Sequence, residues 1–170
     1  MKSGNVYLLD SSVLIDARRR HYGFDFCPGF WEALTRGHQA GRVFSIDRVH
    51  DELNRQQDEL TDWANTLPKG FFLDSRTATI AGEFAPMMRW VQNQPQFTDA
   101  AKAEFASADE ADGWLIAMAR AREFVVATSE GFIADIKIRV PIPNVCRQFD
   151  VPYLDTFTML RELKVKLVLA

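Results

Sequence analysis

Short, continuous apolar runs alternate along this chain with segments of helical periodicity. The clearest runs are "VYLL" at 6–9 and "FVVA" at 124–127. Strands that are apolar throughout are typical of parallel sheets covered on both faces, and strands that alternate with helices build such sheets. The sequence therefore predicts an α/β fold with a central parallel sheet in three α/β/α layers, formed by a single domain over residues 1–170.

The predicted boundaries of the helices and strands follow from residues that start or end such elements, such as glycine, proline and helix caps. Strands are predicted at 5–10, 42–47, 71–75 and 124–130, and helices at 12–20, 30–41, 47–67, 77–94, 107–123 and 154–163, with another beginning at Thr98. Pro86 should kink or restart its helix. The expected helix caps are Ser11 or Ser12, Asp47, and a capping box of Ser107 and Glu110.

Composition narrows the classes of function. The net charge of −3 argues against a general nucleic-acid coat, although a local basic patch stays compatible with it. The two cysteines, Cys27 and Cys146, lie far apart and favour neither a disulfide framework nor a zinc-thiolate site. No apolar run approaches the roughly 20 residues of a membrane helix, so we expect a cytoplasmic protein without a membrane partner.

Acidic residues stand where strands end and helices begin. Asp10 follows "VYLL" and Glu130 follows "FVVATS", while Glu52 and Asp112 lie near the starts of the helices after other strands. The carboxyl ends of parallel strands share one edge, where ligands bind. The four carboxylates are therefore expected to converge there.

Converging carboxylates repel one another unless a cation or protons neutralise them. Mg²⁺ or Mn²⁺ suits such oxygen ligands, because these ions are commonly held by a few carboxylates together with water and a substrate phosphate. The arrangement therefore indicates hydrolysis of a phosphodiester.

Each acid also has an ordinary structural interpretation. Asp10 could cap the following helix, and Glu52 could be a solvated residue on a highly charged helix. Asp112 competes with the neighbouring first-turn acids Asp109 and Glu110. Glu130 could be an exposed loop residue.

Four stretches, "YLLDSSVLIDA", "SIDRVHDEL", "DGWLIAMA" and "FVVATSE", in this order resemble the signatures of the PIN domain, an α/β fold of metal-dependent ribonucleases. The resemblance implies that Asp10, Glu52, Asp112 and Glu130 are catalytic metal ligands, with Asp135 as the alternative fourth acid. It also implies that Ser12 and Thr128 contact substrate.

The resemblance further implies partners. The closing segment is similar to the tails of PIN-like proteins found beside a small partner gene, which suggests the toxin of a toxin–antitoxin pair, with an RNA substrate, a protein antitoxin and a homodimer. Arg18 and Arg19 could hold RNA phosphates, or could be a solvated helix end. The early aromatic cluster of Phe24, Phe26, Phe30 and Trp31 is expected in the core, with one or two of these side chains available to dock a partner helix or a second copy.

Two other classes of function fit parts of the pattern. Asp10 could be the nucleophile of a phosphatase, but the second aspartate that this chemistry favours two positions later is Ser12 here. Alternatively, the chain could be a binding protein with a degenerate acidic crevice, in which case metal would not stabilise the fold.

Overall fold

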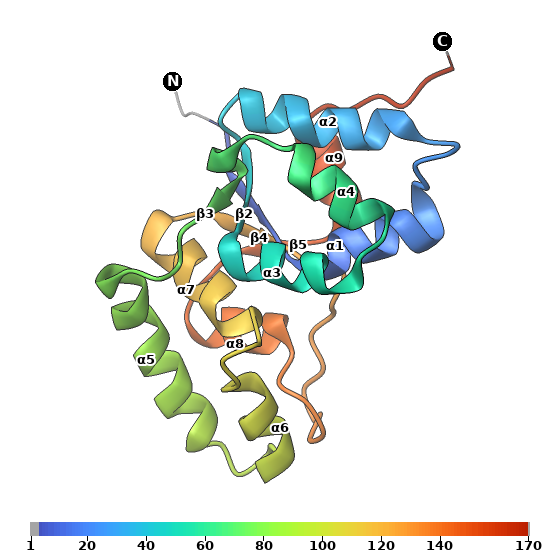
Figure 1. Cartoon of the computed structure of the whole chain (residues 1–170). Helices are drawn as coiled ribbons and strands as arrows, with labels where there is room; N and C mark the ends of the chain where they lie inside the picture. The colour runs from blue at the N-terminus through green and yellow to red at the C-terminus, as the bar shows by residue number, and fades with distance from the viewer. Residues whose placement is uncertain (1–3, 170) are drawn as a thin grey trace.

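The computed structural model describes residues 4–169, in which five short strands form one sheet in the order β3-β2-β1-β4-β5. The strands are β1 (Tyr7–Leu9), β2 (Val43–Ile46), β3 (Phe72–Leu73), β4 (Val125–Ala127) and β5 (Tyr153–Leu154). Every neighbouring pair is parallel, with Tyr7 opposite both Val43 and Val125. Helices cover the sheet on both faces (Figure 1), which confirms the predicted three-layer α/β/α fold.

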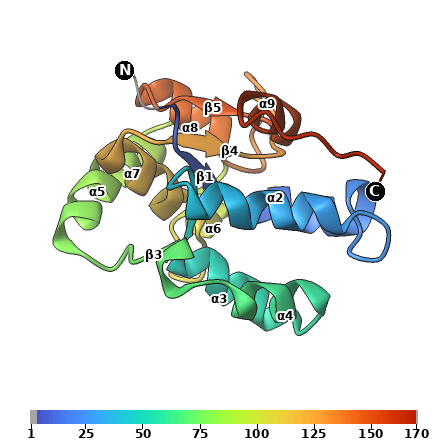
Figure 2. The same cartoon turned by 90° about the horizontal axis from the view of Figure 1, so that it is seen from above.

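The helices alternate with the strands as the sequence predicts. They are α1 (Ser11–Asp16), η1 (Ala17–His21), α2 (Pro28–Gln39), α3 (Asp47–Gln56), α4 (Glu59–Thr66), η2 (Lys69–Phe71), α5 (Ala78–Gln92), α6 (Asp99–Phe105), α7 (Asp112–Arg122), α8 (Ile142–Gln148) and α9 (Thr156–Glu162). Helix α2 lies on one side of the sheet, and α7 and α8 lie on the other, with α5 outside α7 (Figure 2). No helix in the described range 4–169 is long and apolar enough to cross a membrane.

The predicted helix over 47–67 is wrong, because the structure divides it into α3 and α4. Gln57 adopts a left-handed backbone conformation with φ of 49°, and Asp58 then caps α4. The Asp58 carboxylate accepts hydrogen bonds from the Leu60 and Thr61 amides, and the Thr61 hydroxyl accepts one from the Asp58 amide. This capping box lies inside a charged segment whose periodicity continues through the break.

The three expected caps are also wrong. Asp10, rather than Ser11 or Ser12, occupies the N-cap position of α1, and Asp47 is the first residue of α3. Glu110 and Ser107 form a turn through a 3.1 Å hydrogen bond between the Glu110 amide and the Ser107 carbonyl. Helix α7 begins only after this turn, at Asp112.

Prolines stand inside a helix or at the start of one in two places. Helix α5 runs through Pro86 without a restart, and the proline-containing stretch after residue 136, for which the sequence predicts no element, forms α8 and β5. Pro143 lies in the first turn of α8, where the missing amide proton has no helical partner to lose.

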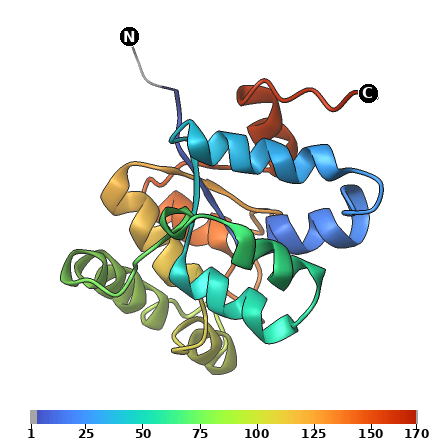
Figure 3. The ribbon, with the colours of Figure 1, turned by 45° about the horizontal axis from the view of Figure 1, so that its top comes forward.

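Most of the early aromatic cluster lies in the core, as predicted. Phe30 and Trp31 are buried, and Phe24 stacks on Trp31 with the ring centroids 4.0 Å apart. Phe26 differs, because 68% of it is exposed beside a groove between α2 and the C-terminal segment that follows α9. This segment runs alongside α2 (Figure 3).

Gly113 allows α7 to approach its neighbours closely. A Cβ atom there would lie 2.8 Å from the Phe84 ring and 3.2 Å from Met88, while a Cβ on Gly82 of α5 would meet nothing within 4 Å. We expect Gly113→Ala to lower the free energy of unfolding by about 1–2 kcal/mol, because overpacking exceeds the gain in helix propensity. Gly82→Ala should raise it by about 0.5–1 kcal/mol. Urea denaturation of both variants checks this, and equal gains would contradict the packing argument.

Candidate active site

One cavity at the carboxyl edge of the sheet contains the four predicted acids. Asp10 follows β1, Glu130 follows β4, Glu52 lies on α3, and Asp112 is the first residue of α7. All four line a cavity of about 630 Å³. Three further acids line it as well: Asp16, Glu104 and Glu110.

Asp10 is the most buried of these acids, with 3% of the residue exposed. Its carboxylate accepts hydrogen bonds from the Ser12 hydroxyl at 2.5 Å and the Thr128 hydroxyl at 3.0 Å. Although Asp10 precedes α1, its side chain makes no capping hydrogen bond within the described residues, so the alternative of a simple helix cap is wrong. Burial, together with the charge of Glu130, raises the pKa of Asp10 to about 6 despite these hydrogen bonds.

Ser12 and Thr128 are placed beside Asp10 rather than free in the cavity. Each hydroxyl donates to the Asp10 carboxylate and accepts a backbone amide, from Ser129 at 3.0 Å and Glu130 at 3.1 Å respectively. These contacts fix the carboxylate of Asp10 and tie the end of β1 to the segment after β4. The geometry supports a role in orienting Asp10, while the contact with substrate stays a prediction.

Glu52 and Asp112 face an electrostatically unfavourable environment. Burial raises the pKa of Glu52 to about 7, and the charges of Glu110 and Asp10 add to the rise. The pKa of Asp112 is raised well above its usual range by burial first, and then by the charges of the surrounding carboxylates. Within residues 4–169 no protein group donates a hydrogen bond to the Asp112 side chain. A cation in the cavity would offset this repulsion.

The two acids that the sequence offers as alternatives to Asp112 lie in different places, one outside the cavity and one in its lining. Asp109 is exposed and pairs with Arg55 at 3.7 Å, away from the cavity. Glu110 lines the cavity and contributes to the raised pKa values of its neighbours. The sequence offers Glu110 as a helix cap and as a competitor of Asp112, and the structure brings both side chains to the same cavity.

Glu130 is closely held by the protein. Its carboxylate forms an ion pair with Arg139 and accepts a 2.7 Å hydrogen bond from the Ile142 amide at the start of α8. Asp135, the alternative fourth acid, is exposed and lies outside the cavity lining. The structure therefore brings Glu130, and not Asp135, to the other acids.

The donor set suits Mg²⁺ or Mn²⁺ in its chemistry, since carboxylate oxygens dominate the cavity. In the described part of the chain, no three His, Cys, Asp or Glu side chains are arranged so that they could together hold a metal ion. Mg²⁺ is commonly bound through one or two carboxylates with several waters, so two of these side chains, Asp10 and Asp112, would be sufficient as protein ligands.

The sequence also identifies a family. A family model described as "Domain of unknown function (DUF4411)" matches residues 7–167, nearly the whole chain. The chain belongs to the DUF4411 family. No curated protein matches it. The matched range contains every acid of the cavity, so the site lies within the DUF4411 domain.

The two arginines predicted to hold phosphate lie outside the cavity lining of the DUF4411 domain. Arg18 pairs with Asp58 at 3.3 Å, and its buried Nε atom has no hydrogen-bond partner within the described residues. Arg19 is exposed in η1. The structure thus gives Arg18 a structural contact and leaves Arg19 on the surface.

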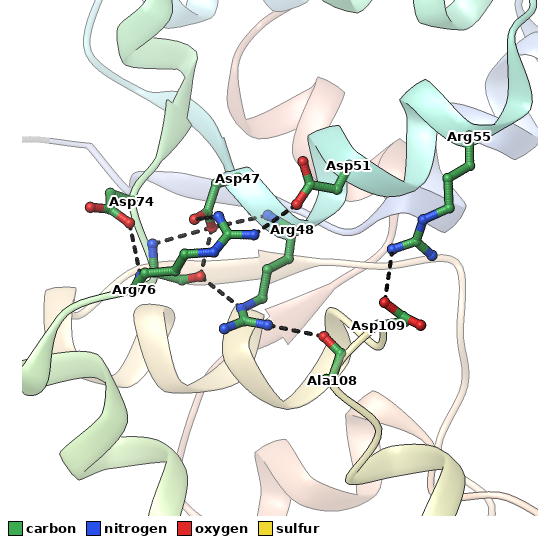
Figure 4. A network of polar contacts seen from close by, with 9 residues as sticks. Asp47, Arg48, Asp51, Arg55, Asp74, Arg76, Ala108 and Asp109 are labelled. Atoms are coloured by element: carbon green, nitrogen blue, oxygen red, sulfur yellow. Dashed lines mark hydrogen bonds and ion pairs between the residues drawn. The ribbon is translucent and has the colours of Figure 1, made fainter.

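A second polar network holds α3, which carries Glu52, against α7. Figure 4 shows Arg48 reaching from α3 to the loop before α7, where it donates to the Ala108 carbonyl at 3.1 Å. Its Nε donates to the Ser75 hydroxyl at 3.1 Å, and its guanidinium lies 4.1 Å from the ring centre of Trp114. Asp47 and Asp51 pair with Arg76 in the same network. Arg48 therefore connects α3, which carries Glu52, to α7 and the loop before it, where Asp112 is the first helical residue.

Replacing Arg48 with methionine should destabilise the fold. The change removes both hydrogen bonds and the cation–π contact and leaves the buried Ser75 hydroxyl with fewer partners, so we expect a loss of about 2–3 kcal/mol in the free energy of unfolding. The control is Arg55→Met, which breaks one exposed ion pair and should change stability by less than about 1 kcal/mol. Similar losses in both variants in chemical denaturation would contradict this account.

Proposed function

We propose that the chain is a Mg²⁺- or Mn²⁺-dependent endoribonuclease of PIN type that acts as the toxin of a toxin–antitoxin pair. The observation that carries the proposal is the partly buried Asp112 carboxylate, surrounded by Asp10, Glu52 and Glu110 and without a protein hydrogen-bond donor in the described range. Such a group favours a bound proton or a cation. The order of the four sequence signatures adds support for the ribonuclease class.

Different residues of the cavity would have different roles in this reaction. When bound, the divalent cation would neutralise the carboxylates, activate a water and stabilise charge on the leaving oxygen. Asp10 and Asp112 would hold it, and Ser12 and Thr128 keep the Asp10 carboxylate in one orientation. Glu52, with a pKa of about 7, can accept a proton near neutral pH. In this proposal a single RNA strand would enter the cavity at the carboxyl edge of the sheet.

The protein antitoxin of this proposal would reach the same edge. A basic side chain inserted among the carboxylates would neutralise them as a cation does, and it would block the cavity at the same time. A homodimer belongs to the same proposal through the PIN resemblance.

The chemistry of the products tests the proposed reaction. Attack by water on phosphorus needs no ribose 2′-hydroxyl, so we expect linear phosphate ends and continued cleavage at a site with a single 2′-deoxy substitution. The assay uses a labelled RNA oligonucleotide with Mn²⁺, whose products are identified by mass spectrometry. Products with 2′,3′-cyclic phosphate ends, or loss of cleavage at the deoxy site, would contradict metal-assisted hydrolysis. Release of phosphate from a monoester without cleavage of RNA would favour the phosphatase alternative.

A further inference from the structure

Arg139 is the one basic residue among the described residues that line the acidic cavity. It belongs to the segment between β4 and α8, together with Ile138 and Val140, which also line the cavity. About half of the Arg139 side chain, 48%, is exposed. A guanidinium at the mouth of an acidic, open cavity is therefore accessible to a ligand from solution.

Glu130 fixes the position of this guanidinium. One carboxylate oxygen pairs with Nη2 of Arg139, and the other accepts the Ile142 amide at 2.7 Å. Both oxygens thus have protein partners, in contrast to Asp112. A carboxylate that already has a guanidinium and an amide as partners gains less from a metal ion than one that has none.

The remaining donors of Arg139 suit a phosphate. Arginine carries five N–H donors in a planar fork, and the hydrogen bond that the structure gives the Arg139 side chain within residues 4–169 uses Nη2 alone. Guanidinium groups bind phosphate oxygens in bidentate geometry. The surrounding carboxylates would repel a phosphate, so the positive charge of the Arg139 guanidinium is what allows a polyanion to approach.

We propose that Arg139 binds a phosphate of the substrate strand and that Glu130 is the positioning residue of Arg139 rather than a metal ligand. This inference rests on the proposed function, since it assumes a phosphodiester substrate. The proposal changes the predicted role of Glu130 from a metal ligand to a positioning residue. It also assigns phosphate binding to Arg139, which lines the cavity, instead of to Arg18 and Arg19. Metal binding then depends on Asp10 and Asp112, and substrate binding depends on Arg139.

Two measurements separate these roles. Titration calorimetry with Mn²⁺ alone reports metal binding, and fluorescence anisotropy of a labelled single-stranded RNA in Ca²⁺ reports strand binding. We expect Arg139→Ala to keep the Mn²⁺ affinity within about twofold and to weaken RNA binding by about tenfold or more. The slope of log affinity against log salt concentration should fall by about one, since one phosphate contact is lost. Arg139→Lys should recover part of the RNA affinity, because it keeps the charge.

Glu130→Gln tests the positioning role, since the amide oxygen can still accept the Ile142 amide while the charge that holds Arg139 is lost. We expect Glu130→Gln to weaken RNA binding and to lower Mn²⁺ affinity only slightly, through the loss of one nearby negative charge, whereas Asp112→Asn should lose Mn²⁺ binding. A Glu130→Gln variant that loses Mn²⁺ binding to the same extent as Asp112→Asn would overturn the assignment of Glu130. Wild-type RNA affinity in Arg139→Ala would overturn that of Arg139.

The failure of this inference is distinguishable from that of the proposed function. If wild-type protein binds Mn²⁺ and cleaves RNA while Arg139→Ala does both equally well, the inference alone is wrong. If the wild type binds neither Mn²⁺ nor RNA, the proposed function fails and the inference fails with it. Thermal midpoints of all variants show whether a loss of binding reflects unfolding.

Discussion

Asp10→Asn is expected to reduce metal-dependent RNA cleavage by at least about a hundredfold while the chain stays folded. The substitution removes the charge that a cation would need, at a buried position between Ser12 and Thr128. The asparagine oxygen can still accept the hydrogen bond of either hydroxyl, so the packing of the site changes little. Initial rates with saturating Mn²⁺ measure the effect.

The matched control for Asp10→Asn is Asp135→Asn. Asp135 is exposed and lies outside the cavity, although the sequence offers it as an alternative to Glu130. We expect cleavage within about twofold of wild type for this control, because an exposed charge outside the cavity contributes little to a buried site. Full activity in Asp10→Asn would exclude Asp10 as a metal ligand.

Asp112→Asn should make the metal-free chain more stable at pH 8 than the wild type. The pKa of Asp112 is raised by burial and by its carboxylate neighbours, so its ionisation opposes folding at this pH. A neutral side chain removes that repulsion. For a chain of this size, a gain of about 1 kcal/mol would raise the thermal midpoint by about 2–4 °C. Scanning calorimetry in the presence of a chelator measures the shift.

The dependence on pH follows from the same carboxylates. The folded chain holds protons on Asp10, with a pKa raised from 3.8 to about 6, and on Glu52, with a pKa of about 7, that the unfolded chain releases near pH 4. The stability of metal-free wild type therefore falls as pH rises from about 4 to 7, by roughly 2–3 kcal/mol for Asp10 alone. Mn²⁺ should reverse this trend by binding the ionised form.

The control for Asp112→Asn is Asp109→Asn, at an exposed position three residues earlier. It should leave the thermal midpoint unchanged in chelator and should keep the full stabilisation by Mn²⁺. If Asp112→Asn lowers the midpoint in chelator, the Asp112 carboxylate is stabilised by the fold, and the electrostatic account of the cavity is wrong.

The sequence predicts the architecture well because the architecture depends on coarse patterns. Runs such as Tyr7–Leu9 and Val125–Ala127 are apolar throughout, and each is followed by polar residues. Details that depend on one backbone angle are not predicted. At Gln57, nothing in the charged pattern of the sequence indicates the left-handed conformation. The short strand β5 and helix α8 are missed because their prolines are compatible with either a loop or an element start.

For the site, the sequence predicts which acids meet but not what else they touch. The convergence of Asp10, Glu52, Asp112 and Glu130 follows from strand ends and helix starts in a parallel sheet. The ion pair between Glu130 and Arg139 depends on the path of a segment without regular structure, so no periodicity indicates it. The sequence offers Glu110 only as an alternative to Asp112 and not as its neighbour in the cavity, because Glu110 is placed by the turn before α7 and not by a helix.

The most direct test of a metal-dependent ribonuclease is cleavage of one labelled RNA by the purified chain in three successive states: with Mn²⁺, after chelation, and after Mn²⁺ is restored in excess. The account predicts cleavage, its loss and its recovery, together with a higher thermal midpoint whenever Mn²⁺ is present. Cleavage that continues unchanged in chelator would contradict the assignment of the acidic cavity as the catalytic site. No cleavage and no thermal shift with Mn²⁺ would instead favour a protein whose acidic crevice binds neither metal nor RNA.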